Sequence, residues 1–225
     1  MRGTYLDLLA KYGISGAHPG GLHLTKRILN TLNFDINTRL LDLGCGTGQT
    51  LAYIAKTYPC KITGVDINNQ MLNRAAFRFK TENLPVELYC ANVMDLPFPG
   101  DSFDIALSES VTIFTKIDKA LKEYERVLKS EGTLLAIEMS AEYPLSSREV
   151  EEIKSVYGIE YVPTVKEWEE LFRTAGFKGI QTNSEAIYPT LTFTSPKMLY
   201  DFYPHLRTIS RYRKILGYRV YHCKK

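Results

Sequence analysis

From residue 39 onward, short apolar runs alternate with segments whose apolar residues recur at helical spacing. Apolar runs bounded by turn-forming residues indicate strands, and these are predicted at residues 39–44, 61–66, 85–90, 103–108 and 133–139. Helices are predicted between them, at residues 49–58, 69–82 and 116–132, with Gly132 ending the last one. Strands that alternate with helices of this length imply βαβ units, and therefore a parallel sheet covered on both faces.

The segments on either side of this alternation have a different character. Ahead of it, residues 21–32 have the pattern of a helix, preceded by the turn "AHPGG". After it, a helical insertion is expected around the stretch "SSREVEEIKSVYG". An amphipathic helix follows at residues 164–177, with Thr164 as its N-cap. The remaining elements are a strand, a helical segment and a last strand, expected at 179–187, 195–217 and 218–223. Pro204 should break the helical segment.

A glycine-rich loop is the first chemical signal in the chain. In "LLDLGCGTGQT", residues 40–50, an apolar run falls into glycines before a helix. Such a loop lets a backbone approach a ligand closely, and a helix N-terminus there favours a negative group. Nicotinamide dinucleotides and S-adenosylmethionine are both held in this way. The dinucleotide fingerprint requires G-x-G-x-x-G, but Gln49 occupies the third glycine position and the glycine falls at Gly48.

A second signal supports a nucleoside without choosing between these cofactors. Asp66 ends the second predicted strand, eighteen residues after Gly48. A carboxylate at that place can accept hydrogen bonds from both ribose hydroxyls of an adenosine, which either cofactor requires. The position of Gln49 therefore remains the argument against an oxidoreductase.

Four motifs occur in a fixed order, namely "DLGCGTG", "GVDINNQML", "VMDLPFPGDSFD" and "EYERVLKSEGTLLAIEM". This ordered set closely resembles the class I S-adenosylmethionine-dependent methyltransferases, and within them the small-molecule group that includes the ubiquinone/menaquinone-type enzymes. The resemblance covers roughly residues 38–140. "GAHPGGLHLTKRIL" and "SESVTIFT" also resemble an uncharacterised bacterial branch of the superfamily, which names no substrate.

The pattern and the resemblance together predict an α/β fold of the doubly wound, Rossmann-like type. Its sheet should have seven strands, mostly parallel, with the last strand antiparallel. The chain has no internal repeat or low-complexity linker, so residues 1–225 are interpreted as a single methyltransferase domain. Within it we expect an N-terminal helical lid, a cofactor-binding core and two helical insertions, at residues 1–36, 38–140, 141–163 and 189–217.

The resemblance implies how the chain holds the methionine and ribose parts of S-adenosylmethionine. The loop at Gly44, Cys45 and Gly46 should approach the methionine end. Asp42 should fix this loop and, directly or through water, bind the ammonium group. Asp66 should hold the ribose hydroxyls.

The resemblance also implies the surroundings of the adenine. Ile67 and Met71 should pack on the ring, the Asn92 side chain should meet its amino group, and the Val93 amide should face a ring nitrogen. The family often has Asp where this chain has Asn92, but an asparagine side chain can still accept that hydrogen bond. Ser108, at the end of the fourth strand, should lie beside the methionine portion.

Three residues are candidates for a general base, which methyl transfer requires only when the acceptor must lose a proton. His18 precedes the first lid helix, and histidine side chains titrate near neutral pH; its alternative role is to orient a turn. Glu109 follows the fourth strand at the end where ligands bind in such sheets, with a capping role as its alternative. Glu138 interrupts an apolar strand, where a structural partner could equally hold it.

The acceptor is predicted to be a small molecule. No [DNS]-P-P-[YF] motif follows the fourth strand, where the chain has "SESVTIF", and no Pro-Cys lies there. Both observations disfavour methylation of DNA bases. Aromatic residues in the outer segments favour an apolar or aromatic acceptor; they are Tyr5, Tyr12, Phe114, Tyr143, Tyr200, Phe202 and Tyr203.

Two alternatives to a small-molecule methyltransferase remain open, and the first of them comes from the charge distribution. The net charge of +3 is too small to argue for nucleic acid, but the last twenty residues hold seven basic residues and no acid. A solvated helix face is the simple interpretation, and an RNA methyltransferase that uses this basic segment is one alternative. A non-catalytic module that binds S-adenosylmethionine is the other.

The four cysteines are far apart and form no C-x-x-C pair, so neither a zinc site nor a disulfide framework is predicted. The absence of paired cysteines indicates that the protein resides in a reducing compartment. The N-terminus lacks the apolar core of a signal peptide, and no apolar run approaches the length of a membrane span. We therefore expect a cytoplasmic protein.

Overall fold

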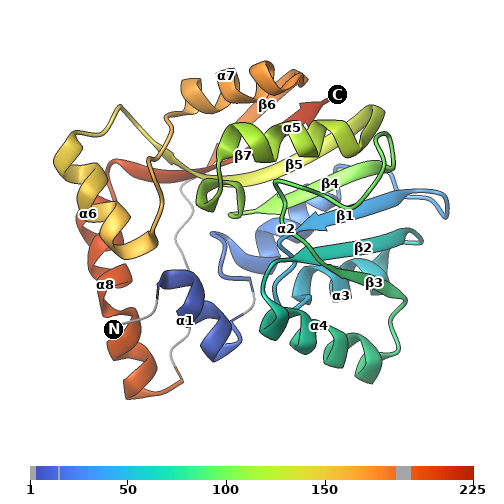
Figure 1. Ribbon diagram of the computed structural model, residues 1–225, viewed down its shortest axis with the longest axis horizontal. Helices are drawn as coiled ribbons and strands as arrows, with labels where there is room; N and C mark the ends of the chain where they lie inside the picture. The colour runs from blue at the N-terminus through green and yellow to red at the C-terminus, as the bar shows by residue number, and fades with distance from the viewer. Residues whose placement is uncertain (1–3, 15, 186–193) are drawn as a thin grey trace.

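A seven-stranded sheet forms the centre of the molecule, whose computed structural model describes residues 4–14, 16–185 and 194–225 (Figure 1). The strand order is β3-β2-β1-β4-β5-β7-β6. β7 runs antiparallel to both of its neighbours, and the other pairings are parallel. The strands are β1 Arg39–Leu43, β2 Lys61–Asp66, β3 Val86–Cys90, β4 Phe103–Glu109, β5 Leu128–Ala141, β6 Lys178–Glu185 and β7 Leu216–Lys224. The predicted Rossmann-like fold with an antiparallel last strand is confirmed.

Helices cover both faces of the sheet, and each face has its own apolar core. Alternate residues of a strand point to opposite faces. Leu40 accordingly packs with α2 (Gly21–Leu29), α3 (Gln49–Thr57) and α4 (Asn69–Glu82), whereas Leu41 packs with α5 (Ile117–Val127) and α7 (Val165–Ala175). In the described part of the chain, no helix is long and apolar enough to cross a bilayer.

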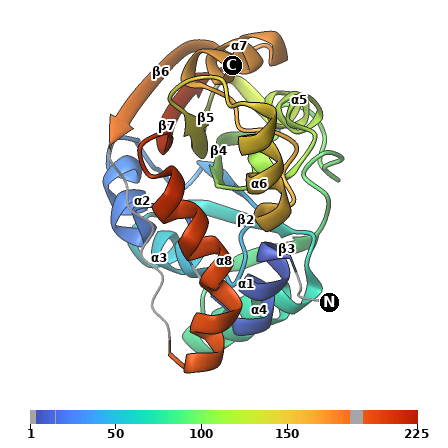
Figure 2. The ribbon, with the colours of Figure 1, turned by 90° about the vertical axis from the view of Figure 1, so that its left-hand side faces the viewer.

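A third group of helices lies beyond the carboxyl ends of the parallel strands (Figures 1 and 2). It consists of α1 (Tyr5–Tyr12), α6 (Ser147–Tyr157) and α8 (Pro196–Tyr212), each in contact with the other two. Asp201 of α8 accepts hydrogen bonds from the Lys11 ammonium at 2.8 Å and the Tyr12 hydroxyl at 2.6 Å. These contacts tie α1 to α8 across the end of the sheet.

Local sequence signals explain where these outer helices begin. Ser146 starts α6 with a reciprocal pair of hydrogen bonds to Glu149, and Thr164 starts α7 with the same arrangement. Such capping boxes satisfy two backbone N–H groups that the first turn would leave unpaired. The prediction of Thr164 as an N-cap is therefore confirmed.

Two expectations about helices are wrong, one about where a helix ends and one about a break within a helix. The helix predicted to reach Gly132 ends at Val127, because Leu128 already pairs with Phe103 in the sheet. The ladder then shifts register, so that the residues before Thr133 form an irregularity at the start of β5. Pro204 does not break α8, which is continuous from Pro196 to Tyr212. Predicted elements that extend into residues 186–193 lie partly outside the described residues.

The irregularity in β5 has no room for a side chain at Gly132. A Cβ atom there would lie 2.7 Å from the backbone oxygen of Lys129, which cannot move without disturbing the ladder. We expect Gly132→Ala to lower the free energy of unfolding by about 1–3 kcal/mol, as overpacking does. Urea denaturation measures this change. Ser130→Ala, at an exposed neighbour, should stay within about 0.5 kcal/mol of wild type; equal effects of the two variants would contradict the packing argument.

Candidate active site

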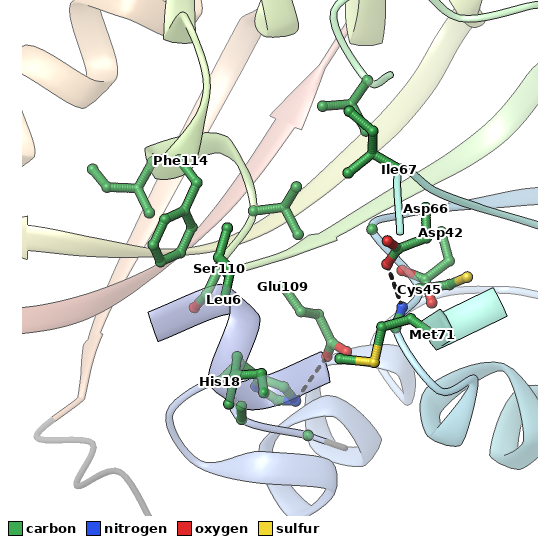
Figure 3. A pocket seen from close by; sticks show the side chains of 18 of the residues that line it. Leu6, His18, Asp42, Cys45, Asp66, Ile67, Met71, Glu109, Ser110 and Phe114 are labelled. Atoms are coloured by element: carbon green, nitrogen blue, oxygen red, sulfur yellow. Dashed lines mark hydrogen bonds and ion pairs between the residues drawn. The ribbon is translucent and has the colours of Figure 1, made fainter. Parts of the chain in front are cut away.

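A cavity of about 290 Å³ lies at the carboxyl ends of β1, β2 and β4 (Figure 3). The strand order reverses between β1 and β4. β2 and β3 are added on one side of β1, and the later strands are added on the other side. Ligands of open α/β sheets bind at such a switch point. α1, Ile14 and residues 16–19 line the cavity on one side. The predicted lid segment at the N-terminus therefore contributes directly to the wall.

The glycine loop closes tightly around the end of β2. The N–H groups of Gly44 and Cys45 both donate to the Val65 carbonyl, at 2.8 and 2.9 Å. Gly44 has φ +79°, and a Cβ atom there would lie 2.5 Å from Val111. At Gly46, with φ +54°, a Cβ atom would meet no protein atom within 4 Å. The loop therefore presents open space to a ligand at Gly46 while it packs closely at Gly44.

Asp66 holds this loop from the neighbouring strand. One carboxylate oxygen accepts from the Gly46 N–H and the other from the Asn68 N–H, both at 2.8 Å. Burial raises the pKa of Asp66, and the backbone hydrogen bonds partly oppose that shift. The side chain lines the cavity, and its remaining lone pairs are oriented to accept hydrogen bonds from a ligand.

Asp42 also lines the cavity, but it does not fix the loop in the manner expected. Within the described part of the chain no hydrogen bond joins it to the glycines, and Asp66 performs that task. Asp42 is 2% exposed, and its pKa is raised well above its usual range by burial and then by the charges of Glu109 and Asp66. Because its charged neighbours are carboxylates, a cationic ligand group would be stabilised here.

The residues expected around the adenine all line the same cavity. Ile67 is 69% exposed although it is apolar, and Met71 is buried beside it. Asn92 uses its side-chain oxygen to accept from the Met94 N–H at 3.0 Å, and a second lone pair remains for a ligand. The exposed apolar surface of Ile67 and the polar group of Asn92 are suited to a flat heterocycle.

His18 and Glu109 form a pair on the cavity wall (Figure 3). His18 Nε2 lies 3.4 Å from Glu109 Oε1, and His18 Nδ1 lies 3.2 Å from the Pro19 carbonyl oxygen. The two side chains are 3% and 10% exposed. Glu109 also accepts hydrogen bonds from the hydroxyls of Thr25 and Thr50, the latter at 2.7 Å. No motif in the sequence indicates that these two threonines would support Glu109.

Two predicted site residues do not line the cavity, and their expected roles are corrected here. Ser108 and Glu138 are fully buried. Glu138 accepts hydrogen bonds from the Ser108 hydroxyl at 3.1 Å and from the N–H groups of Thr112 and Ile113 at 3.0 and 3.3 Å. A carboxyl group enclosed in this way anchors the short helix η1 (Thr112–Phe114), and no acceptor can reach it as a base.

The remaining chemistry of the site is limited. Burial raises the pKa of the Cys45 thiol, which is therefore protonated and unreactive at neutral pH. No cluster of three or more metal-ligating side chains occurs in residues 4–14, 16–185 and 194–225. Three further lining residues, Met139, Tyr157 and Tyr218, come from distant segments and belong to no motif that indicates a place in the site.

The cavity fits a nucleoside with a charged amino-acid part. Asp66 offers carboxylate oxygens for the ribose hydroxyls, and the open space at Gly46 admits a group close to the backbone. Ile67 and Asn92 provide the apolar and polar surroundings of an adenine. Asp42 and Glu109 add two carboxyl groups to the wall, and a bound ammonium or sulfonium group would oppose the raised pKa of Asp42 and favour its ionised form. The donor set is thus the one that S-adenosylmethionine requires.

Comparison with known proteins identifies the family. Residues 41–136 match the model of the methyltransferase domain family. "Uncharacterized methyltransferase YodH" of Bacillus subtilis (strain 168) is 35% identical over 228 residues, which cover 96% of this chain and 97% of that protein. The chain therefore belongs to the methyltransferase domain family and is an S-adenosylmethionine-dependent methyltransferase. The resemblance drawn from the four ordered motifs is confirmed.

Two further proteins show how far this likeness extends. "Ubiquinone/menaquinone biosynthesis C-methyltransferase UbiE" of Vibrio vulnificus (strain YJ016) is 37% identical over 145 residues, which cover 61% of this chain and 56% of that protein. The structure of a Haemonchus contortus phosphoethanolamine N-methyltransferase 2 with S-adenosylhomocysteine superposes with a TM-score of 0.77. It is 19% identical, and the match covers 98% of this chain and 57% of that one. At that identity the likeness shows a shared fold.

Because the carboxyl group of Glu138 is buried, we expect the free energy of unfolding to depend on pH. Its pKa is raised from 4.5 to about 7, because burial outweighs the hydrogen bonds from Thr112, Ser108 and Ile113. Between these two pH values the folded protein keeps a proton that the unfolded chain has lost. The stability contributed by Glu138 is therefore greatest below pH 4.5 and falls as the pH rises towards 7, by up to about 3 kcal/mol.

Glu138→Gln isolates this effect, because the other titratable groups are common to both proteins. We expect the stability of wild type relative to Glu138→Gln to fall between pH 4.5 and 7. Urea denaturation of both proteins across this range measures the difference. A difference that does not change with pH would show that the carboxyl group has the same protonation state in the folded and unfolded protein.

Proposed function

We propose that the protein transfers a methyl group from S-adenosylmethionine to a small molecule by in-line displacement. One observation carries the proposal: a single cavity joins the glycine loop and Asp66 at one end to an apolar, aromatic wall at the other. The second end includes Phe114 and Tyr157, which come from segments outside the cofactor loop. An acceptor bound there would lie in line with a donor held at the loop.

The protein's task in such a reaction is alignment and exclusion of water. S-adenosylmethionine supplies an electrophilic methyl group on a positively charged sulfur. Asp66 and the glycine loop orient the donor, while Tyr5, Ile14 and residues 16–19 cover the cavity and keep solvent from the reacting groups. The carboxylates of Asp42 and Glu109 bind the positive end of the donor in preference to an anion.

For an acceptor that must lose a proton, His18 and Glu109 are the proposed proton acceptors. When the proton on His18 lies on Nδ1, it donates to the Pro19 carbonyl, and Nε2 keeps its lone pair. A proton then taken up at Nε2 lies 3.4 Å from the Glu109 carboxylate, which stabilises the imidazolium. The threonine hydroxyls that bond to Glu109 hold the pair in this orientation.

The structure gives arguments against both alternatives, an RNA methyltransferase and a non-catalytic module that binds S-adenosylmethionine. An RNA methyltransferase would need an unpaired basic surface, whereas Arg211, Arg219 and Lys225 each form an ion pair with an acidic side chain. A non-catalytic module would not need a second, apolar end to its cavity. Both alternatives predict S-adenosylmethionine binding, so methyl transfer to a small molecule, rather than to RNA or to no acceptor, separates our proposal from them.

Removal of the Asp66 carboxylate tests cofactor binding. Asp66→Ala should weaken binding of S-adenosylmethionine and S-adenosylhomocysteine at least tenfold, about 1.4 kcal/mol, since it removes a charged hydrogen-bond partner and loosens the Gly46 loop. Isothermal titration calorimetry with both nucleosides and with NADH measures this. Asp118→Ala, an exposed carboxylate of α5, is the control and should leave the affinities unchanged. Binding of NADH alone would overturn the cofactor assignment.

Removal of the His18 imidazole tests the proton acceptor. His18→Gln should lower turnover by about 100-fold, since general-base catalysis contributes that much or more, while the affinity for S-adenosylhomocysteine stays within about threefold. Transfer of tritiated methyl groups to the low-molecular-weight fraction of a cell extract measures turnover, with RNA as a separate acceptor. His23→Gln, an exposed histidine of α2, is the matched control. Full turnover of His18→Gln would reject the role of His18 as proton acceptor, and label in RNA alone would reject a small-molecule acceptor.

A further inference from the structure

The end of the cavity away from Asp66 is lined mainly by apolar and aromatic side chains, together with the hydroxyls of tyrosines and of Ser110. In Figure 3, Leu6 and Phe114 lie on one side of the His18–Glu109 pair, and Asp66 and Met71 lie on the other. The apolar and aromatic side chains of the lining come from α1, η1, β5, α6 and β7, and the Tyr5 ring lies against the rings of Phe114 and Tyr157; they are Tyr5, Leu6, Leu9, Ile113, Phe114, Met139, Tyr157 and Tyr218. This surface buries an apolar molecule and leaves few positions for polar recognition.

The charges of the cavity are of one sign. Asp42, Asp66 and Glu109 line it, and among the residues that the structure describes no lysine or arginine does. A phosphate or carboxylate on the acceptor would therefore face these carboxylates with no lysine or arginine side chain to pair with it. Burial of an unpaired anion beside like charges is costly, so such acceptors are disfavoured.

Of the tyrosine hydroxyls in this wall, that of Tyr157 is supported by a buried histidine. The Tyr157 hydroxyl lies 2.7 Å from His205 Nδ1. His205 is 4% exposed, Tyr5 stacks on its ring, and burial lowers its pKa to about 4. At neutral pH the imidazole is therefore uncharged and carries one proton, on either Nδ1 or Nε2.

The surroundings of His205 decide where that proton lies. Nε2 is buried and has no hydrogen-bond partner in the described part of the chain. A buried N–H without an acceptor is rarer than a buried acceptor without a donor, which favours the proton on Nδ1. Nδ1–H then donates to the Tyr157 oxygen, so the Tyr157 O–H must donate elsewhere. Tyr157 lines the cavity, and the described residues give its hydroxyl no other hydrogen-bond partner.

We propose that the methyl acceptor is an uncharged, mainly apolar molecule with a neutral oxygen, such as a carbonyl, that accepts a hydrogen bond from Tyr157. This inference rests on the proposed function and names the class of its substrate. Tyr157 selects the acceptor by its position opposite the cofactor loop, and His205 keeps the Tyr157 hydroxyl oriented as a donor.

Three probes of one shape test the two parts of the proposal. 2-Acetylnaphthalene carries a neutral carbonyl, 2-naphthoate replaces its methyl group by a charged oxygen, and 2-isopropenylnaphthalene replaces its carbonyl oxygen by carbon. Each is titrated by calorimetry into protein saturated with S-adenosylhomocysteine. We expect the ketone to bind about fivefold tighter than the alkene, the value of one neutral hydrogen bond, and at least tenfold tighter than the carboxylate.

Tyr157→Phe then removes the donor while it keeps the ring. The preference for the ketone over the alkene should disappear, and the preference over the carboxylate should remain. Tyr143→Phe, at a tyrosine that is 48% exposed, is the matched control and should change neither ratio. Because each ratio is measured within one protein, a general loss of stability in the variant does not alter its meaning.

The outcomes separate this inference from the proposed function. Failure of S-adenosylhomocysteine to bind wild type would reject the proposed function itself. Normal nucleoside binding with no binding of any probe, equal affinities for ketone and alkene, or stronger binding of the carboxylate would reject the inference alone. An unchanged ketone preference in Tyr157→Phe would reject the role of that hydroxyl.

Discussion

The hydrogen bond from the Gly46 N–H to the Asp66 carboxylate is the contact on which the site depends. It joins the loop after β1 to the end of β2, so that two neighbouring parallel strands fix one ligand position. The same carboxylate must keep lone pairs free for a ligand, and its burial makes that charge unfavourable without one. The loop geometry and the affinity for a nucleoside are therefore two effects of one side chain.

The sequence predicted those parts of the site that are local in the chain. Gly44, Gly46 and Asp66 belong to short motifs whose backbone geometry follows from residue type. Ser108 and Glu138 were predicted to lie in the site but are buried in the core, because successive residues of a strand face opposite sides of the sheet. Glu109 and Met139 line the cavity, whereas the residues just before them point into the core. A position near the carboxyl end of a strand does not reveal which face it occupies.

The parts that could not be predicted depend on contacts between distant segments. Tyr157 and His205 meet only because α6 and α8 pack together beyond the sheet. Thr25 reaches Glu109 across more than eighty residues of chain. The fold itself was more accessible, since the alternation of strands and helices is repeated along the chain and each repeat supports the same topology. The start of β5 was missed because Leu128 and Phe103 pair over a register shift that no periodic pattern reports.

The contacts of Asp201 with Lys11 and Tyr12 have a kinetic consequence. They hold α1 against α8, and α1 forms part of the cover of the cavity. Opening the cavity on this side would require α1 to move away from α8, and that movement breaks both hydrogen bonds. Polar contacts far from the reacting groups would then contribute to the barrier for exchange of acceptor and product, separately from the barrier of methyl transfer.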